Sequence, residues 1–308
     1  MFGKFDGREN QHTNNYSYSY FCTIVSRTGI QVIRKWWQNL RMKKDEFPIV
    51  RVNYDAEIER FSGRNQLLVA LFPKFNEAMD KSFIQVHTTT NDHLAIVIHM
   101  LIRLALRHYE AIFHLAMCGH GFSANRILRS MFEKYVDAHY IHLNPVQIED
   151  FWDYHLFTLK DEWGAERLQE MSPDYETKLA RFYTVNPRTH KKRKRPRWSK
   201  LDFVAKVDKV GANDFLEAAY RRPSAFVHSS VTEIIASFYL EEDDTISPAS
   251  ESTDTERNYA DSTMLAATPV AYAALKLLNE HFSLDEPPEL DIFFNEYYEG
   301  WKKESAKF

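Results

Sequence analysis

The sequence contains little glycine and almost no cysteine. Glycine occupies 9 of 308 positions, about 3% against a usual ~7%, although β-hairpins and phosphate-binding loops both depend on it. The two cysteines, Cys22 and Cys118, are too few for a Cys-rich zinc site or a disulfide framework. These absences favour an all-α protein of a reducing, cytoplasmic compartment, and they argue against a nucleotide-binding fold with a glycine-rich loop.

Long apolar runs and a strong net charge are also missing. The chain has 39 Lys and Arg against 43 Asp and Glu, a net charge of −4, and its mean hydropathy is −0.47. We therefore expect no membrane-spanning segment and no secretory signal peptide. A hydrophobic content of 44%, with 14% aromatic residues, still provides enough apolar surface for a large core.

The hydrophobic pattern predicts a helical bundle built around a central hairpin of two long helices. The longest pattern runs over residues 92–118 and is closed by Gly119 and Gly121. The next begins at Ser123, an N-cap residue followed by apolar side chains at helical spacing. Two long helices joined by so few residues are expected to pack antiparallel.

Shorter helices and two charged loops are expected around this hairpin. An N-terminal helical region covers residues 1–90, and a helical core covers residues 91–308. Further helical patterns are present over residues 23–42, 55–86, 144–172, 175–182, 198–210, 213–220, 223–239, 263–282 and 289–303. A basic loop is expected at 188–200, and an acidic, Ser/Thr-rich, mobile loop at 241–262.

The C-terminal helix has an aromatic face. The residues that share this face are Leu290, Phe293, Phe294, Tyr297 and Trp301. Because such a face must be buried, we expect it to pack on this domain. The alternative is a contact with a protein partner.

The sequence carries no strong catalytic or metal-binding motif. It has no Walker loop, no G-x-S-x-G or H-E-x-x-H sequence, no paired C-x-x-C and no calcium loop. Histidines do lie at ligand-like spacing, as His139 and His142 do, and as His108 and His114 do around Glu110. A helical metal site needs ligands repeated on a second helix, so we expect no metal and no cofactor.

A first polar cluster lies on the helix that begins at Ser123. Opposite the apolar stripe, one face carries Arg126, Arg129, Ser130, Glu133 and Asp137. Arg129 and Glu133 have the i, i+4 spacing of an ion pair. The cluster is a solvent-exposed face, a buried structural ion pair, or a cleft that binds an anion.

A second polar cluster surrounds Pro223, which is expected to open a helix. Ser224 and His228 share a face that borders the apolar stripe. Arg222 precedes the helix, where its side chain and the free N–H groups of the first turn favour a phosphate or a carboxylate. These residues could bind a phosphodiester and transfer a proton near neutral pH. The alternative is a partly buried His228 with a structural hydrogen bond.

The two clusters together resemble a widespread, all-helical family of prokaryotic proteins of unknown function. The likeness is carried by the string ANRILRSMFE, whose R-S-x-x-E motif ends at Glu133, and by the Y-x-x-x-S-x-x-x-H motif of Tyr220, Ser224 and His228. The resemblance covers about residues 92–239. It implies a helical fold but no particular activity.

Arg222 and His228 also resemble the motif of HEPN domains, in which an Arg precedes a His by a few residues. Many of these helical dimers are metal-independent ribonucleases of toxin and antiphage systems. Pro223 departs from the polar residue common after that Arg. The resemblance implies that Arg222 contacts the scissile phosphate, that His228 is the acid or base, and that the protein is a homodimer. His228→Ala should then abolish cleavage while the fold survives.

The most concentrated charge in the chain is the string RTHKKRKRPRWSK, residues 188–200. It holds eight positive charges, so the rest of the chain carries −12. The candidate RNA-binding residues are Lys191, Lys192, Arg193, Lys194, Arg195 and Arg197. Such a run suits phosphate backbones, and its alternatives are a solvated loop or, in a eukaryotic protein, a nuclear import signal. Trp198 could stack on a base, but we expect it to anchor the next helix.

Two classes of function follow from these patterns. In an RNA-cleaving or RNA-binding effector, the basic loop delivers RNA to Arg222, Ser224 and His228, while Arg129 and Glu133 order that cleft. In a non-catalytic scaffold or sensor, the same residues form a buried polar network. An open, positively charged pocket around these side chains would favour the effector, and a sealed core would favour the scaffold.

Overall fold

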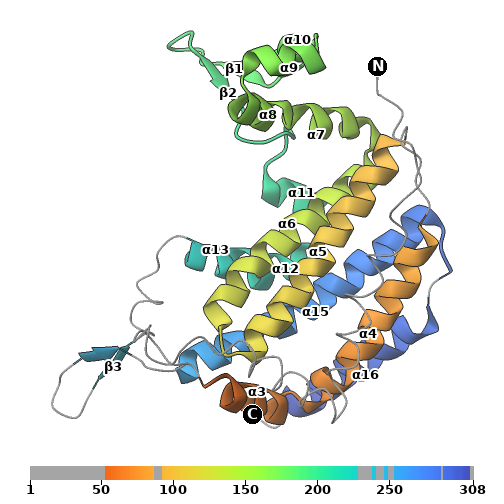
Figure 1. Ribbon diagram of the computed structural model, residues 1–308, viewed down its shortest axis with the longest axis vertical. Helices are drawn as coiled ribbons and strands as arrows, with labels where there is room; N and C mark the ends of the chain where they lie inside the picture. Colours follow the sequence, from red (N-terminus) through yellow and green to blue (C-terminus); the bar gives the residue numbers. More distant parts are fainter. Residues whose placement is uncertain are drawn as a thin grey trace.

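The computed structural model describes residues 53–86, 92–227, 238–240, 246–248, 253–285 and 287–305. Helices form most of this part, which confirms the predicted all-α fold (Figure 1). The longest are α3 (Tyr54–Arg64), α4 (Gln66–Gln85), α5 (His93–Met117), α6 (Gly121–Leu143), α15 (Asp254–Phe282) and α16 (Pro288–Ser305). No helix in these ranges is both long and apolar enough to span a membrane.

Shorter elements connect the long helices. They are the 3-10 turn η1 (Pro145–Gln147), α7 (Ile148–Tyr154), α8 (Leu156–Trp163), α9 (Ala165–Met171), α10 (Tyr175–Ala180), α11 (Phe203–Lys209), α12 (Asn213–Leu216), the π-helical turn η2 (Glu217–Arg221) and α13 (Arg222–Val227). Two antiparallel ribbons pair β1 (Tyr183–Val185) with β2 (Lys192–Lys194) and β3 (Phe238–Leu240) with β4 (Ile246–Pro248). The helix predicted over 23–42 lies outside the described residues.

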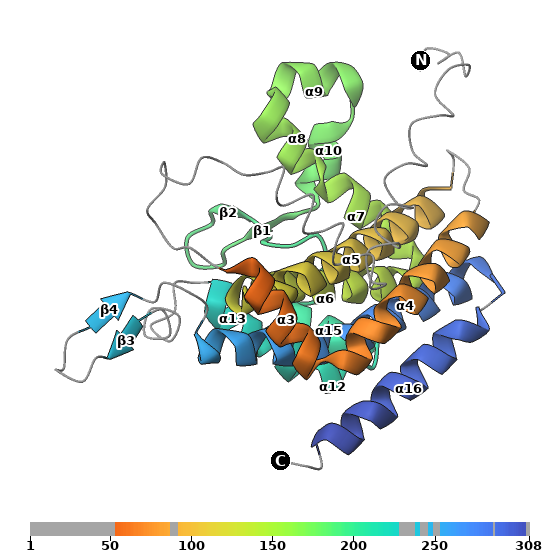
Figure 2. The same ribbon diagram turned by 60° about the horizontal axis from the view of Figure 1, so that its bottom comes forward.

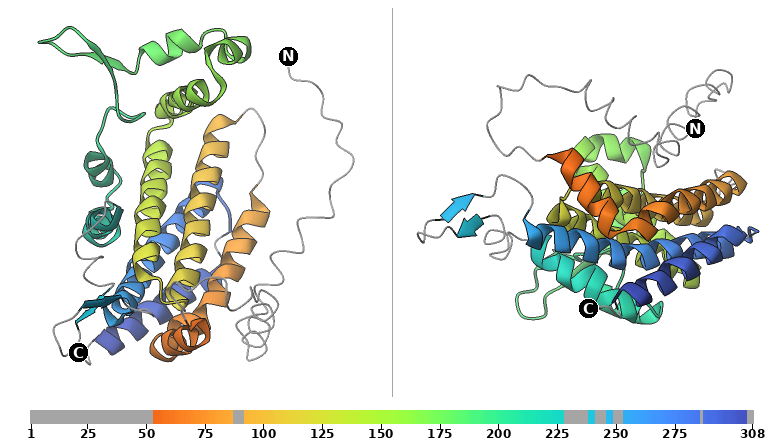
Figure 3. Two further views of the ribbon diagram at one scale, coloured as in Figure 1. Left: turned by 60° about the vertical axis from the view of Figure 1, so that its left-hand side comes forward. Right: turned by 90° about the horizontal axis from the view of Figure 1, so that it is seen from below.

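The predicted hairpin of α5 and α6 forms the centre of the bundle. α5 has the predicted bounds, because the side chain of Asp92 accepts a hydrogen bond from the Ala95 N–H at 2.9 Å and Cys118 caps the other end. α15 packs against both helices and crosses behind them in the left panel of Figure 3. The buried hydroxyls of Tyr109 in α5 and Thr268 in α15 are hydrogen-bonded at 3.1 Å.

The start of α6 differs from the prediction by three residues. The helix begins at Gly121 instead of after Ser123. Gly119, with a φ of 78°, ends α5 in the left-handed conformation, but Gly121 is already helical. A Cβ atom on Gly121 would lie 2.1 Å from the carbonyl oxygen of Glu256 in α15. Gly121 therefore permits close helix packing and does not terminate a helix.

The aromatic face of α16 packs within this chain, as expected. Leu290, Phe293 and Tyr297 are buried, and the Phe293 ring lies 4.8 Å from the Phe75 ring of α4. Figure 2 shows α16 running alongside α4. The side chain of Trp301 is outside the described part. A protein contact through this helix stays a prediction and would use its outer face.

The acidic segment 241–262 is not the continuous loop that its composition predicts. Residues 246–248 form β4, and α15 begins at Asp254. The side chain of Thr253 accepts a hydrogen bond from the Glu256 N–H at 3.1 Å, and acidic residues in a first turn favour the helix dipole. Residues 254–262, part of the segment that suggested a loop, are therefore the start of a helix.

Residues 148–197 form an outgrowth at the top of Figure 1. The single helix predicted over 144–172 is broken, because the chain turns at Gly164, whose φ is 82°. The resulting short helices bury a small core of their own, made of Phe157, Leu168, Tyr175, Leu179 and Phe182. Trp152 and Trp163, which a single helix would place on its apolar face, are exposed.

Candidate functional site

The Arg129–Glu133 pair predicted on α6 is present and contacts the second motif. Arg129 Nε donates to Glu133 Oε1 at 3.1 Å, and the guanidinium carbon lies 4.8 Å from the ring centre of Tyr220. The Tyr220 ring stacks on Phe203 at 4.2 Å. Only 23% of the Arg129 side chain is exposed. Its charge is therefore matched by a carboxylate and covered by an aromatic ring.

Arg222 and Ser224 make their contacts within their own helical segment. Arg222 is 69% exposed, and its Nε lies 3.9 Å from Glu217 Oε1. Ser224 Oγ donates to the carbonyl oxygen of Tyr220. Among the residues with described side chains, no hydrogen bond or ion pair joins either of them to the Arg129–Glu133 pair. His228 lies outside the described residues, so the Arg222–His228 site stays a prediction.

A π-helical turn places Tyr220 beside α6. The Arg222 N–H donates to the carbonyl of Glu217, five residues earlier. Pro223 explains this widening, because proline has no N–H to donate and its ring crowds the preceding turn. The last two residues of the helix predicted over 223–239 lie instead in strand β3 (Phe238–Leu240). The residues between α13 and β3, 228–237, are outside the described part.

Asp137, the last member of the first cluster, holds a buried lysine that the sequence patterns did not single out. Lys206 of α11 is 3% exposed and donates through Nζ to Asp137 Oδ1. The indole N–H of Trp198 donates to the other carboxylate oxygen at 3.4 Å. Trp198 is buried, so it anchors the chain as expected and does not stack on a base. In the sequence, only the position of Lys206 between the apolar residues Ala205 and Val207 could have indicated that it is buried.

Ser130 is also hydrogen-bonded, to a lysine one turn further along α6. Lys134 Nζ donates to Ser130 Oγ at 2.8 Å, and burial lowers the pKa of Lys134. Burial first, and the charge of Lys134 second, lower the pKa of His108 on α5 to about 4. The buried Nδ1 of His108 has no hydrogen-bond partner among the described residues. The face of α6 is thus a packed polar seam against α5 and α11.

The basic segment 188–200 was predicted as a loop, and part of it is a strand. Lys192–Lys194 forms β2, which pairs with β1. In this pairing Lys192 lies opposite Val185 and Lys194 lies opposite Tyr183. We call residues 183–197 the basic arm. It projects from the outgrowth and lies well above α13 in Figure 1. The two halves of the predicted RNA site are therefore separated on this chain.

The cations of the basic arm fall into two groups. At its base, Lys194 Nζ lies 4.0 Å from the ring centre of Phe157, and the Arg195 guanidinium lies 4.9 Å from that of Phe182. The outer cations Lys191, Lys192 and Arg193 are exposed. Within the described residues no carboxylate pairs with these three, whereas nearby Lys178 and Arg181 are all paired with aspartates. The outer arm is an uncompensated positive surface.

The middle of the chain matches a known protein family. A model of a family of unknown function, DUF5677, matches residues 95–246. The stretch includes both motif helices and the basic arm, which confirms the predicted resemblance to a helical family without a known activity. No curated protein and no solved structure matches the chain.

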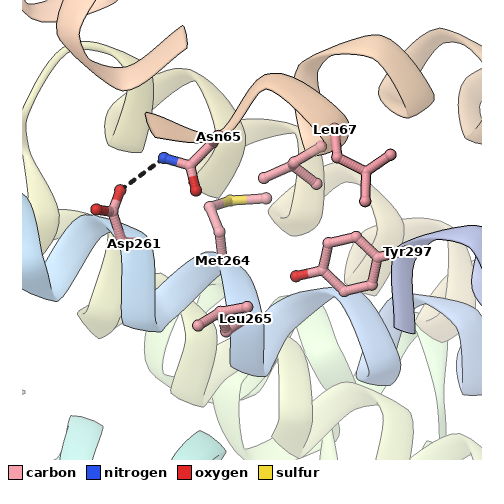
Figure 4. Close-up of a pocket in the computed structure, with 7 residues that line it drawn as sticks. Asn65, Leu67, Asp261, Met264, Leu265 and Tyr297 are labelled. Atoms are coloured by element: carbon pink, nitrogen blue, oxygen red, sulfur yellow. Dashed lines mark hydrogen bonds between the residues drawn. The ribbon is translucent and has the colours of Figure 1, made fainter. Parts of the chain in front are cut away.

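A small cavity outside the family stretch offers no alternative site for a substrate. It lies between α4, α15 and α16, beside the hydrogen bond that Asn65 Nδ2 donates to Asp261 Oδ1 at 2.8 Å (Figure 4). Its volume is about 30 Å³, the space of one water molecule. Across the described residues, no three His, Cys, Asp or Glu side chains are grouped to hold a metal ion.

Proposed function

We propose that this protein binds RNA and that the basic arm is its main contact. One observation carries the proposal: Lys191, Lys192 and Arg193 are exposed on a projecting segment, and no described carboxylate pairs with them. A phosphate backbone supplies the missing negative charges at regular intervals. Charge compensation within the protein, as for Arg129, is the usual alternative, and it is absent from the described surroundings of these three cations.

The charge distribution over the whole chain supports the same function. Eight positive charges fall within residues 188–200, and the rest of the chain carries −12. An acidic body repels a polyanion, so the electrostatic attraction is confined to the arm. RNA would then be held first at the end of the molecule that carries the arm.

Binding of a labelled RNA by two triple variants tests this proposal. Lys191→Gln/Lys192→Gln/Arg193→Gln is expected to weaken binding about 100-fold at 0.1 M salt, because three phosphate contacts are lost. For the same reason, the plot of log association constant against log salt concentration should become less steep by about 2. Arg103→Gln/Arg107→Gln/Lys209→Gln removes three exposed charges elsewhere and should bind within twofold of wild type. Equal affinities of the two variants, or no binding by wild type, would contradict it.

Metal-independent cleavage of the bound RNA is a separate prediction, supported by the HEPN-like spacing of Arg222 and His228. The same RNA, incubated in EDTA with wild type and with His228→Ala, tests it by gel electrophoresis. Cleavage by wild type alone is the expected result. Intact RNA in both reactions would leave binding as the function of the arm and remove the nuclease.

A scaffold or sensor is the second candidate function. It is favoured by the Arg129–Glu133 pair, since that pair is packed on Tyr220 and linked through it to Phe203. Such a cluster fixes α6 against the α12–α13 segment whatever the ligand. A homodimer, which light scattering at micromolar concentration tests, is compatible with both functions.

A further inference from the structure

One face of the basic arm combines an exposed aromatic ring with lysines. In an antiparallel ribbon, residues directly opposite each other project from the same face. The register pairs Tyr183 with Lys194 and Val185 with Lys192, so these four side chains share a face. Tyr183 is 40% exposed and Val185 is 57% exposed. The face is therefore partly apolar as well as positively charged.

The Tyr183 ring is held in position from one side. It meets the Phe157 ring of the outgrowth core edge to face, with centres 5.7 Å apart and planes at 72°. Lys194 covers the same Phe157 ring at 4.0 Å. The contact limits rotation of the tyrosine, so less conformational freedom is lost when a flat group stacks on its exposed part.

We infer that the arm takes single-stranded RNA, with one base stacked on Tyr183 and a flanking phosphate held by Lys192, which lies on the same face. The inference rests on the proposed RNA binding and adds the class of RNA. Unpaired bases expose a face that can stack on an aromatic ring, whereas the bases of a duplex are stacked on one another. Binding through charge alone would not require an exposed aromatic ring in this position.

Three tyrosine variants and two RNAs test the inference. The probes are a fluorescein-labelled ten-nucleotide oligouridine and a blunt duplex of equal length. Tyr183→Ala is expected to weaken oligouridine binding by about 5-fold to 100-fold, the range for loss of one stacked base, with an unchanged salt slope and unchanged duplex affinity. Tyr183→Phe keeps the ring and should bind within twofold of wild type. Tyr298→Ala removes a tyrosine that is similarly exposed, at 42%, on α16 and should have no effect.

A further variant tests whether Tyr183→Ala weakens binding only because it disturbs the core of the outgrowth. Tyr183→Leu keeps an apolar contact with Phe157 but cannot stack, so it should resemble Tyr183→Ala in binding while unfolding at the wild-type temperature. Wild type that binds the duplex as tightly as oligouridine, or a Tyr183→Ala variant with full affinity, would overturn the inference and leave the proposed function standing. Absence of binding to either RNA would overturn both.

Discussion

Gly121→Ala is expected to destabilise the protein by about 3 kcal/mol or more, because the added Cβ overlaps backbone that cannot move aside. That atom would lie 2.1 Å from the carbonyl oxygen of Glu256 and 2.5 Å from the amide nitrogen of Ala260, both in α15. Relief requires α6 to separate from α15 along the centre of the bundle. Thermal unfolding should show a midpoint lowered by about 6 °C or more.

Gly63→Ala is the matched control for this change. Gly63 also lies in a helix, α3, but no atom of the described part of the chain lies within 4 Å of the position where its Cβ would be. Alanine there should stabilise the protein by up to about 1 kcal/mol, because it has the higher helix propensity. Similar effects of the two substitutions would show that α6 and α15 do not pack as closely as described.

Acidification from pH 7 to pH 5 is expected to lower the free energy of unfolding substantially. Burial is the main cause of a lowered pKa at six histidines: His99, His108, His114, His120, His139 and His281. Each is favoured in its neutral form by the fold and takes up a proton more readily once unfolded. Their stabilising contribution is complete above the unfolded pKa of about 6.5 and is lost as the pH falls towards the folded pKa.

His108 should contribute most to this dependence, since its folded pKa of about 4 puts the loss between pH 6.5 and pH 4. At pH 5 the loss amounts to about 1–2 kcal/mol after allowance for its partial exposure. His108→Met should therefore flatten the decline measured by urea unfolding at pH 7, 6 and 5. His155→Met, at an exposed position, should leave it unchanged. Parallel pH profiles for His108→Met and wild type would contradict the assignment.

The long helices could be predicted because their signals are local. Asp92 caps α5 and Gly119 ends it, and both signals lie within a few residues of the boundary they set. The outgrowth could not be predicted in the same way. Its apolar residues continue a helical pattern across Gly164, and the break shows only in the separate core that the folded-back helices bury.

The same distinction applies to the candidate site. The Arg129–Glu133 pair follows from i, i+4 spacing on one helix. The partner of Asp137 is Lys206, 69 residues away, and no local spacing indicates which lysine a carboxylate will meet. Tyr183 was missed for a similar reason, since its place opposite Lys194 depends on strand pairing within a segment that composition marks as a loop.

The separate core of the outgrowth gives the basic arm an independent stability. Five side chains hold this unit, far fewer than the bundle buries, so its amide protons should exchange through local opening at a lower free energy than global unfolding. A change that weakens the bundle can therefore leave the arm intact, and the reverse also holds. A ligand on the arm would raise the protection of that unit alone, while the bundle would exchange as before.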